Sequence, residues 1–392
     1  MPSDQSTWLL SIPQDGDSEG LLQEMHTKFS SKSLPTNGLA HLQIPAFKTG
    51  TLESLITLSE ELPKQDSFFT QTIAKIVDIL RNLLNNDPSK LVQHILIEER
   101  PVDEYLLNDW SWNEGRYVLH KSLKEIVDTL AKELTSIDNI MKSKLNNYNL
   151  AKGSLVQMQR KKTGNLSIRS LVDIVTKENF IQDSEYMETL LIAVPKSLVK
   201  EWNSKYEKLA SMVVPRSSSS LASDEDYTLF SVVIFRRVHE EFVNNCRENK
   251  FIVRDFAFSE ENIHTQKEEL ETADVTEKEL WTELLRLART NFSEAFQLLV
   301  HLKVVRLFVE SVLRYGLPTN YMGLVIKPDP KYSKKMLDQL QAHFTYLGSR
   351  FGRAAGAKGS ASTNEDFIGE YQTLLEQEMF DFVLYEIPWI TN

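Results

Sequence analysis

The sequence predicts a helix-rich α+β fold with an elongated dumbbell shape. Two long helical patterns flank a central stretch in which strand and helix patterns alternate, and further mixed patterns occupy both ends of the chain. We therefore expect an α/β head of the split β-α-β type, a long antiparallel coiled-coil neck, and a mixed α/β foot made of both chain ends. The predicted divisions are 1–118 and 291–392 for the foot, 119–165 and 259–290 for the two neck helices, and 166–258 for the head.

The N-terminal part of the foot mixes strand and helix patterns. The predicted strands are 8–12 and 39–47, and the predicted helices are 18–29, 52–62 and 68–85. None of these segments has the residue spacing of a chemical site, so we expect a structural scaffold. Near the C-terminus, the glycine-rich residues 352–366 predict a flexible loop, and residues 380–390 alternate like a strand that joins the N-terminal sheet.

The neck helices are predicted from their hydrophobic spacing. Between Leu119 and Met158, apolar or small residues recur about every 3.5 residues without a proline, which is the pattern of a coiled coil. This segment would form a rod of about 60 Å and needs a partner to cover its apolar stripe. A second helical pattern begins at Ser259 and runs, with candidate breaks in 272–276, to Tyr315.

The charges of the two neck helices are opposite. Residues 119–165 contain nine Lys or Arg and four Asp or Glu, a net charge of +5, whereas residues 259–290 contain four and nine, a net charge of −5. Opposite charge favours antiparallel pairing of the two helices. Because exposed ion pairs each contribute less than about 1 kcal/mol, we expect the pattern to set orientation and register more than stability.

The head sequence repeats a strand-helix-strand order. Its predicted strands are 188–194, 211–214, 227–235 and 251–258, and its predicted helices are 198–209 and 238–246. The order β-α-β, loop, β-α-β indicates a split β-α-β, ferredoxin-like sandwich. The joining residues 216–226 contain four consecutive serines and an acidic cluster, and we expect them to be mobile.

Composition and motifs argue against an enzyme or a metal protein. The 392 residues include one cysteine, Cys246, which excludes an internal disulfide and indicates a reducing compartment. Lys358 is followed by glycine where a phosphate-binding loop needs Ser or Thr, and Val243 stands where a helical zinc motif needs its second histidine. His301 falls on an apolar helix, where a hydrogen-bonded core histidine is expected. We therefore expect no catalytic residues, no cofactor and no metal.

Nucleic acid and membrane insertion are also disfavoured. The net charge of −11 is unsuited to binding nucleic acid along the chain. Four basic residues near aromatic side chains suggest an RNA-binding face, but the glycine-aromatic signature of such a face is absent; they are Arg236, Arg237, Lys250 and Arg254. The first thirty residues lack the basic start and apolar run of a signal peptide, and no stretch approaches the roughly 20 apolar residues of a membrane-spanning helix. We expect a cytosolic protein that meets a membrane only through a partner.

Four segments resemble the C subunit of the eukaryotic vacuolar proton-pumping ATPase (V-ATPase). They are GTLESLITLSEEL (50–62), SLVDIVTKENFIQDSEYMETLLIAVPK (170–196), FRRVHEEFVNNCRENKFIVRDFAF (235–258) and NFSEAFQLLVHLKVVRLFVESVLRYGLP (291–318). The resemblance covers both ends and the middle of the chain, and the length is typical of a fungal member. It implies a head, a neck and a foot, the architecture that periodicity and charge also predict.

The resemblance implies a non-catalytic stator, or peripheral-stalk, subunit. Such a subunit bridges the stalks made of the E and G subunits to the cytosolic part of subunit a, and supports ATP-driven proton transport. It is needed to assemble the catalytic and membrane sectors and takes part in their regulated, reversible disassembly. It works on the cytosolic face of the vacuolar or endosomal membrane and is free in the cytosol when the pump is disassembled. We expect the head to dock one E–G heterodimer, and the foot to contact a second E–G pair and subunit a.

Two family-like motifs at element ends supply the candidate partner-binding residues. They are Asp183, Ser184, Glu185 and Tyr186 in the head, and Arg314, Tyr315, Gly316, Leu317 and Pro318 in the foot. Helix capping and helix termination explain these residues equally well. A coiled-coil tether or cytoskeletal adaptor outside the pump is the main alternative function, and an unrecognised enzyme using the head cleft is a weaker one. Secondary binding of actin or nucleotide needs no visible motif and stays open.

Overall fold

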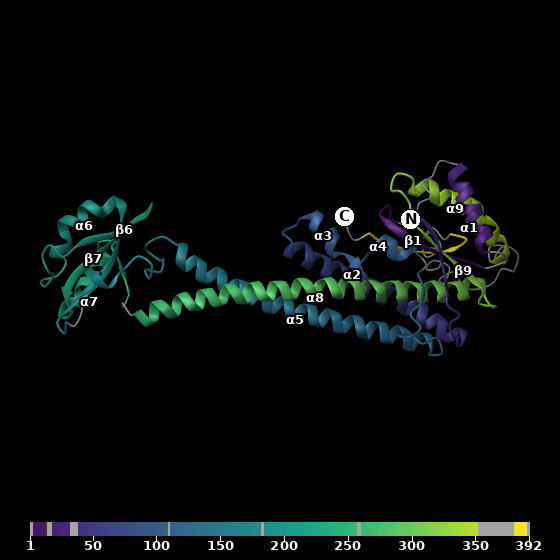
Figure 1. Cartoon of the computed structure of the whole chain (residues 1–392), viewed down its shortest axis with the longest axis horizontal. Helices are drawn as coiled ribbons and strands as arrows, with labels where there is room; N and C mark the ends of the chain where they lie inside the picture. Colours follow the sequence, from purple (N-terminus) through teal and green to yellow (C-terminus); the bar gives the residue numbers. More distant parts are fainter. Residues whose placement is uncertain are drawn as a thin grey trace, which may run out of the picture. The chain divides into compact units, whose positions relative to one another are not determined.

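The chain divides into two compact units. In this computed structural model the described residues are 3–13, 18–31, 38–108, 110–181, 184–256, 260–351 and 380–389. Met1–Lys144 together with Glu283–Asn392 form the first unit, and Leu145–Thr282 form the second. The fold is α+β and helix-rich, as predicted, and its elements are drawn in Figure 1. The predicted foot, neck and head boundaries and the dumbbell shape stay predictions.

The first unit contains a four-stranded antiparallel sheet built from both ends of the chain. Its strands are β1 (Ser6–Pro13), β2 (Leu39–Leu42), β9 (Tyr321–Ile326) and β10 (Val383–Pro388), in the order β10-β1-β9-β2. In the register of the sheet, Leu9 on β1 lies opposite Tyr385 on β10 and Val325 on β9. The predicted pairing of the C-terminal strand with the N-terminal sheet is confirmed. The strand predicted at 39–47 is shorter than expected and ends at Leu42.

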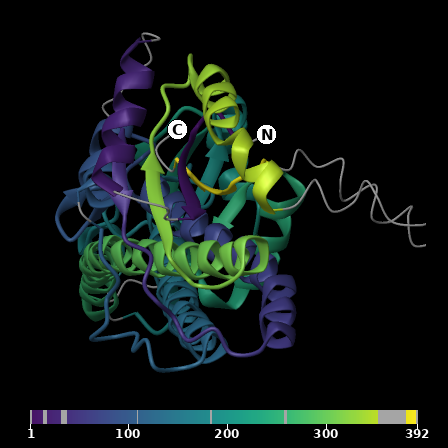
Figure 2. The same cartoon turned by 90° about the vertical axis from the view of Figure 1, so that its right-hand side faces the viewer.

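Helices cover both faces of this sheet. The helices on one face are α1 (Ser18–Ser31) and α9 (Ser333–Phe351), which lie beside the strands in Figure 2. Trp8, Leu10 and Ile12 share the core with these two helices, because alternate side chains of a strand point to the same face. The opposite face contacts the last turns of the long helix α8 (Glu260–Tyr315), where the Ser311 hydroxyl donates to Ser11 Oγ at 2.7 Å.

The helix α2 (Leu52–Leu83) is continuous, so the prediction of separate helices at 52–62 and 68–85 was wrong. Pro63 lies inside α2 and removes one backbone hydrogen bond. The helix continues past it because buried side chains on both sides, such as Leu62 and Phe69, keep the same face on the core.

The elements that follow are α3 (Pro88–His94), β3 (Leu96–Ile97), β4 (Arg100–Pro101) and α4 (Val102–Leu107).

The two long helices are confirmed as single elements. They are α5 (Leu123–Thr163), which begins later than predicted, and α8 (Glu260–Tyr315), which has no break at 272–276. Within the first unit, Lys144 Nζ lies 2.7 Å from Glu283 Oε1, an ion pair of the predicted kind. Within the second unit, burial and a hydrogen bond to Glu277 raise the pKa of Tyr148 to about 12. A coiled coil along the whole length of both helices stays a prediction.

The second unit contains the split β-α-β sheet that the sequence predicts. Its strands are β5 (Met187–Pro195), β6 (Ser219–Ser223), β7 (Tyr227–Phe235) and β8 (Ile252–Arg254), in the antiparallel order β6-β7-β5-β8. The helices α6 (Val199–Lys205) and α7 (His239–Glu248) pack on one face through Trp202 and Phe242. Leu166 and Leu171 belong to the core on the other face. The unit also contains 3₁₀ turns at Lys177–Asn179, Lys196–Leu198, Tyr206–Lys208 and Arg236–Val238.

The second strand of this sheet lies where the sequence predicted a mobile loop. Residues 216–226 contain β6, so that prediction was wrong, and the strand predicted at 211–214 is only a single bridge from Val213 to Ile234. The serines are ordered because their hydroxyls have partners. Ser219 Oγ lies 2.7 Å from Ser231 Oγ on β7, and Trp202 Nε1 donates to Ser218 Oγ at 3.0 Å.

Candidate partner-binding surfaces

The polar clusters of the second unit have structural roles. Cys246 is buried, and burial raises the pKa of its thiol to about 12, so it is not a nucleophile at neutral pH. Burial opposes the ionisation of Asp224, but three backbone N–H groups donate to its carboxylate and hold its pKa below the ordinary value; they belong to Leu166, Asp226 and Tyr227. The described residues contain no group of three or more His, Cys, Asp or Glu placed to hold a metal.

Two of the predicted foot residues are engaged inside the first unit. The Arg314 guanidinium donates to the carbonyl oxygens of Phe380 (2.8 Å) and Phe382 (3.0 Å), beside β10. The Tyr315 hydroxyl donates to the Ser11 carbonyl at 3.0 Å and accepts from the Val383 N–H at 3.1 Å. These bonds attach β10 to the end of α8. Both side chains therefore have a structural role, whether or not a partner also contacts them.

The remaining residues of this motif end α8 and expose one apolar side chain. Gly316 has φ of +78°, the left-handed conformation in which glycine commonly terminates a helix. Leu317 follows it and is 70% exposed, so it is the member of the motif most available to a partner. Pro318 comes next, before β9 begins at Tyr321.

We expect Arg314→Ala to lower the free energy of unfolding by about 2–3 kcal/mol, because two partly buried carbonyl groups lose a charged donor. Amide hydrogen exchange should show faster exchange in residues 383–388. Leu317→Ala is the matched control and should change stability by less than about 0.5 kcal/mol, since its side chain is exposed. Unchanged exchange in β10 of the Arg314 variant would contradict the structural role.

The predicted head motif opens onto a groove in the second unit, which we call the head groove. It has a volume of about 600 Å³ and is lined by Glu185, Tyr186, 211–213 and 235–237. Tyr186 is 72% exposed, Met212 is 41% exposed and Phe235 is 38% exposed. Asp183 lies outside the described residues, and the Ser184 hydroxyl accepts from the Met187 N–H at 3.0 Å, which is a local cap.

The four basic residues noted in the head sequence do not form one face. Arg236 and Arg237 line the head groove, whereas Arg254 donates to the carbonyl oxygens of Ile168 and Arg169 on the loop that follows α5.

Sequence reasoning missed Met212 and Phe235 as groove residues. The available signal was the FRR motif at the end of a predicted strand, which places an aromatic and two cations at a sheet end.

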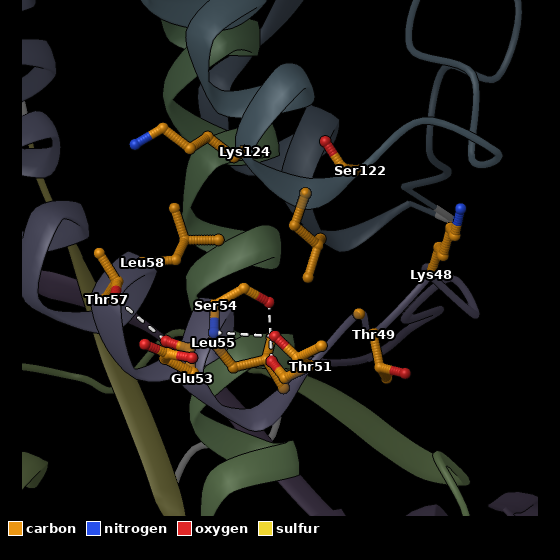
Figure 3. Close-up of a pocket in the computed structure, with 12 residues that line it drawn as sticks. Lys48, Thr49, Thr51, Glu53, Ser54, Leu55, Thr57, Leu58, Ser122 and Lys124 are labelled. Carbon is orange, nitrogen blue, oxygen red and sulfur yellow. Dashed lines mark hydrogen bonds between the residues drawn. The ribbon is translucent and has the colours of Figure 1, made fainter.

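A second hollow lies in the first unit, which we call the foot pocket. It has a volume of about 360 Å³ and is lined by residues of 48–58 and 122–124. Figure 3 shows Lys48 and Lys124 on opposite sides of it, with the Ser54 hydroxyl donating to the Thr51 carbonyl at 2.7 Å. The first turns of α2 and α5 are already capped, because Thr51 accepts from the Ser54 N–H and Ser122 from the Glu125 N–H. Leu52 and Ile56, in the first turns of α2, are exposed. Apolar side chains at this end of the helix suit contact with a protein better than binding of a small anion.

The described residues therefore offer candidate surfaces for protein partners, one on each of the two units. No helix in the described part of the chain has the length and apolar character to span a bilayer. A family model described as the V-ATPase C subunit matches residues 7–383. The chain belongs to this C-subunit family, which consists of non-catalytic stator subunits of the proton pump.

Individual relatives match over nearly the whole chain. The V-type proton ATPase C 1 subunit of Xenopus tropicalis is 37% identical over 383 residues, and that of Bos taurus is 38% identical over 383 residues. In both cases 97% of each chain is covered. A crystal structure of the cytoplasmic N-terminal domain of subunit I, a homologue of subunit a, has 11% identity and a TM-score of 0.23, covering 86% of this chain and 97% of that one. A TM-score this low does not show a shared fold.

Proposed function

We propose that this chain bridges the E–G peripheral stalks of a V-type proton ATPase to the cytosolic part of subunit a. The full-length similarity to the C subunit carries the proposal, because 97% of this chain aligns with 97% of the Xenopus tropicalis relative. The chain then works on the cytosolic face of the membrane, where it holds the catalytic sector still against rotation. The fungal origin suggested by the length of the chain stays a prediction.

The proposed bridge uses candidate surfaces on both units. The head groove, with Glu185 and Tyr186, supports docking of one E–G heterodimer. Exposed Leu317 and the foot pocket support contacts with a second E–G pair and subunit a. Several interfaces of modest affinity hold strongly when engaged together, and loss of one weakens the others by lowering their effective concentration. This property suits a subunit that is released when the pump disassembles.

Calorimetric titration of purified E–G heterodimer into the full chain tests the bridge. We expect saturable binding with a defined stoichiometry. Adding the chain to pump sectors that lack it should restore ATP-driven proton transport in membrane vesicles. The matched control is the same titration with the E subunit alone, which lacks half of the proposed partner. No heat of binding and no restored transport would favour a tether outside the pump.

A further inference from the structure

We infer that a groove between α2 and the end of β10 binds a free α-amino acid with a large apolar side chain. This groove, which we call the α2 groove, lies in the first unit and has a volume of about 290 Å³. Its walls are one face of α2 over residues 70–81, Leu299 on α8, and Pro388 with Trp389. Small-molecule sites usually measure roughly 300–1,000 Å³, so the α2 groove suits a ligand at the small end of that range.

The floor of the α2 groove is apolar and fixed. Ile73 and Val77 lie one turn apart on α2 and are each 2% exposed, and Leu299 on α8 is 1% exposed. These side chains are packed into the core and still line the groove. A branched aliphatic or aromatic group placed against them would leave water without disturbing the packing, and burial of apolar surface is favourable.

Trp389 forms the opposite wall and is held in place before any ligand arrives. Its backbone N–H donates to the Gln5 carbonyl at 2.8 Å, and its ring Nε1 donates to Thr7 Oγ1 at 3.0 Å. Lys327 Nζ lies 5.0 Å from the centroid of the ring. Because the ring is already ordered, a ligand that contacts it does not incur the cost of ordering this side chain.

The lining of the α2 groove also carries two opposite charges, which lie one turn apart on α2. Asp78 Oδ1 accepts from Arg81 Nη1 at 3.0 Å, and the two side chains are 63% and 36% exposed. Neither side chain has a further hydrogen bond or ion pair in the described part of the chain. The second carboxylate oxygen of Asp78 and the second guanidinium edge of Arg81 are therefore available to a ligand.

This pair of charges selects a zwitterion. A ligand with only a carboxylate would face Asp78 as well as Arg81, and a ligand with only an ammonium would face Arg81 as well as Asp78. An α-amino acid carries both groups on one carbon, so each charge of the ligand meets its opposite at the same time. Its side chain then extends over the apolar floor.

A phosphate-bearing ligand fits the α2 groove poorly. The one cation that lines it is already paired with Asp78. The lining part of α2 lies in the middle of a helix that spans Leu52–Leu83, where the backbone N–H groups are used within the helix. Phosphate sites instead use free N–H groups at a helix start together with an excess of positive charge.

Nuclear magnetic resonance of the full chain, with its tryptophans labelled with ¹⁵N, tests the inference. The chain has six tryptophans, and Trp389→Phe identifies the indole signal of Trp389. We expect leucine and phenylalanine to shift this signal saturably, with a dissociation constant of about 0.1–1 mM. Two compounds carry the leucine side chain with only one of the charges, 4-methylpentanoate and 3-methylbutylamine, and each should bind about fivefold more weakly or worse. Alanine, which has both charges but little apolar surface, should leave the signal unchanged at the same concentration.

Variants of α2 separate the groove from an unspecific effect. Ala74→Leu places a larger side chain in the α2 groove and should abolish the shift with leucine. Arg81→Gln should weaken leucine binding about fivefold without weakening the binding of 3-methylbutylamine, which has no carboxylate for the guanidinium to contact. Lys75→Gln is the matched control, since it removes the same charge from an exposed α2 position outside the groove, and it should bind leucine like the unaltered chain.

Several results would overturn the amino-acid site. Equal binding of leucine, the acid and the amine would remove the basis for a zwitterion, and unchanged binding in Ala74→Leu would place the ligand elsewhere. If leucine binds only after residues 390–392 are deleted, the groove belongs to that segment. If the E–G heterodimer or a rise in chain concentration moves the Trp389 signal while leucine does not, the groove is a protein contact. None of these results decides whether the chain bridges the pump, which the calorimetric titration measures separately.

Discussion

Asp66→Ala should destabilise the first unit by about 3–5 kcal/mol, the cost expected when one partner of a buried ion pair is removed. The Asp66 carboxylate on α2 accepts from Lys303 Nζ at 2.8 Å and from the guanidinium of Arg306, both on α8. Lys303 is 4% exposed and Asp66 is 7% exposed, so neither charge is compensated by water. Without the carboxylate, two cations would remain at one buried position and repel each other.

Urea unfolding followed by tryptophan fluorescence measures this loss. Glu61→Ala is the matched control, since Glu61 lies on the same helix and pairs with Lys124 at 3.1 Å on the surface. Exposed pairs contribute about 0–1 kcal/mol, so this variant should stay close to the unaltered chain.

A compensating pair of substitutions separates the charge effect from packing. Asp66→Leu combined with Lys303→Met removes both buried charges and should recover most of the stability, because an apolar pair of similar volume is often no less stable than a buried ion pair. Arg306 keeps a favourable position over the Tyr385 ring, 4.2 Å from its centroid. Equal losses in the Asp66 and Glu61 single variants would contradict this account.

Hydrophobic periodicity predicted most of the fold because it reports which faces are buried. The long helices, the strand that returns from the C-terminus to pair with β1, and the split β-α-β order all follow from such patterns. The errors have local causes. Ser219–Ser223 is rich in serine and so resembled a loop, yet Leu221 and Ala222 pack against the core and its hydroxyls and backbone bond to β7. The helix predicted at 52–62 stopped one residue before Pro63, but burial on both sides of this proline overrides the lost hydrogen bond.

The head groove could not be predicted in full, because its walls come from three separate stretches of the chain. The family-like motif identified Glu185 and Tyr186, but the register that places Met187 opposite Phe235 exists only in the folded sheet. That register brings Arg236 beside Tyr186 and adds the 211–213 segment on the other side of β7. The sequence likewise could not distinguish Tyr186, which is exposed, from Arg314, whose guanidinium hydrogen-bonds to the Phe380 and Phe382 carbonyls inside the first unit.

The stability of the first unit should fall as the pH drops below about 6.5, in part because His301 must stay neutral. This side chain is 3% exposed among Trp110, Trp112 and Tyr117, as expected for a core histidine. Burial lowers its pKa from 6.5 to about 4, although a hydrogen bond between Nδ1 and the Gln297 carbonyl opposes the shift. Its Nε2 accepts from the Asn113 N–H at 3.3 Å, which requires an unprotonated nitrogen.

The sign of the effect follows from proton binding in the two states. Above pH 6.5 the ring is neutral in both the folded and the unfolded chain, so its contribution is fully present. Between pH 6.5 and about 4 the unfolded chain takes up a proton that folded His301 does not, and stability is lost. One pKa unit corresponds to about 1.4 kcal/mol, so the loss should reach about 2 kcal/mol near pH 5 and about 3 kcal/mol below pH 4.

His301→Gln tests this contribution through the difference between two pH values, and not through stability at either one. The variant should be less stable than the unaltered chain at neutral pH, because glutamine fills the aromatic pocket less well. Between neutral pH and pH 5, however, it should lose about 2 kcal/mol less in urea unfolding than the unaltered chain does. His120→Gln, at an exposed position, is the control and should follow the unaltered chain at both pH values. If the His301 variant loses as much stability on acidification as the unaltered chain, the buried neutral imidazole is not the source of the acid sensitivity.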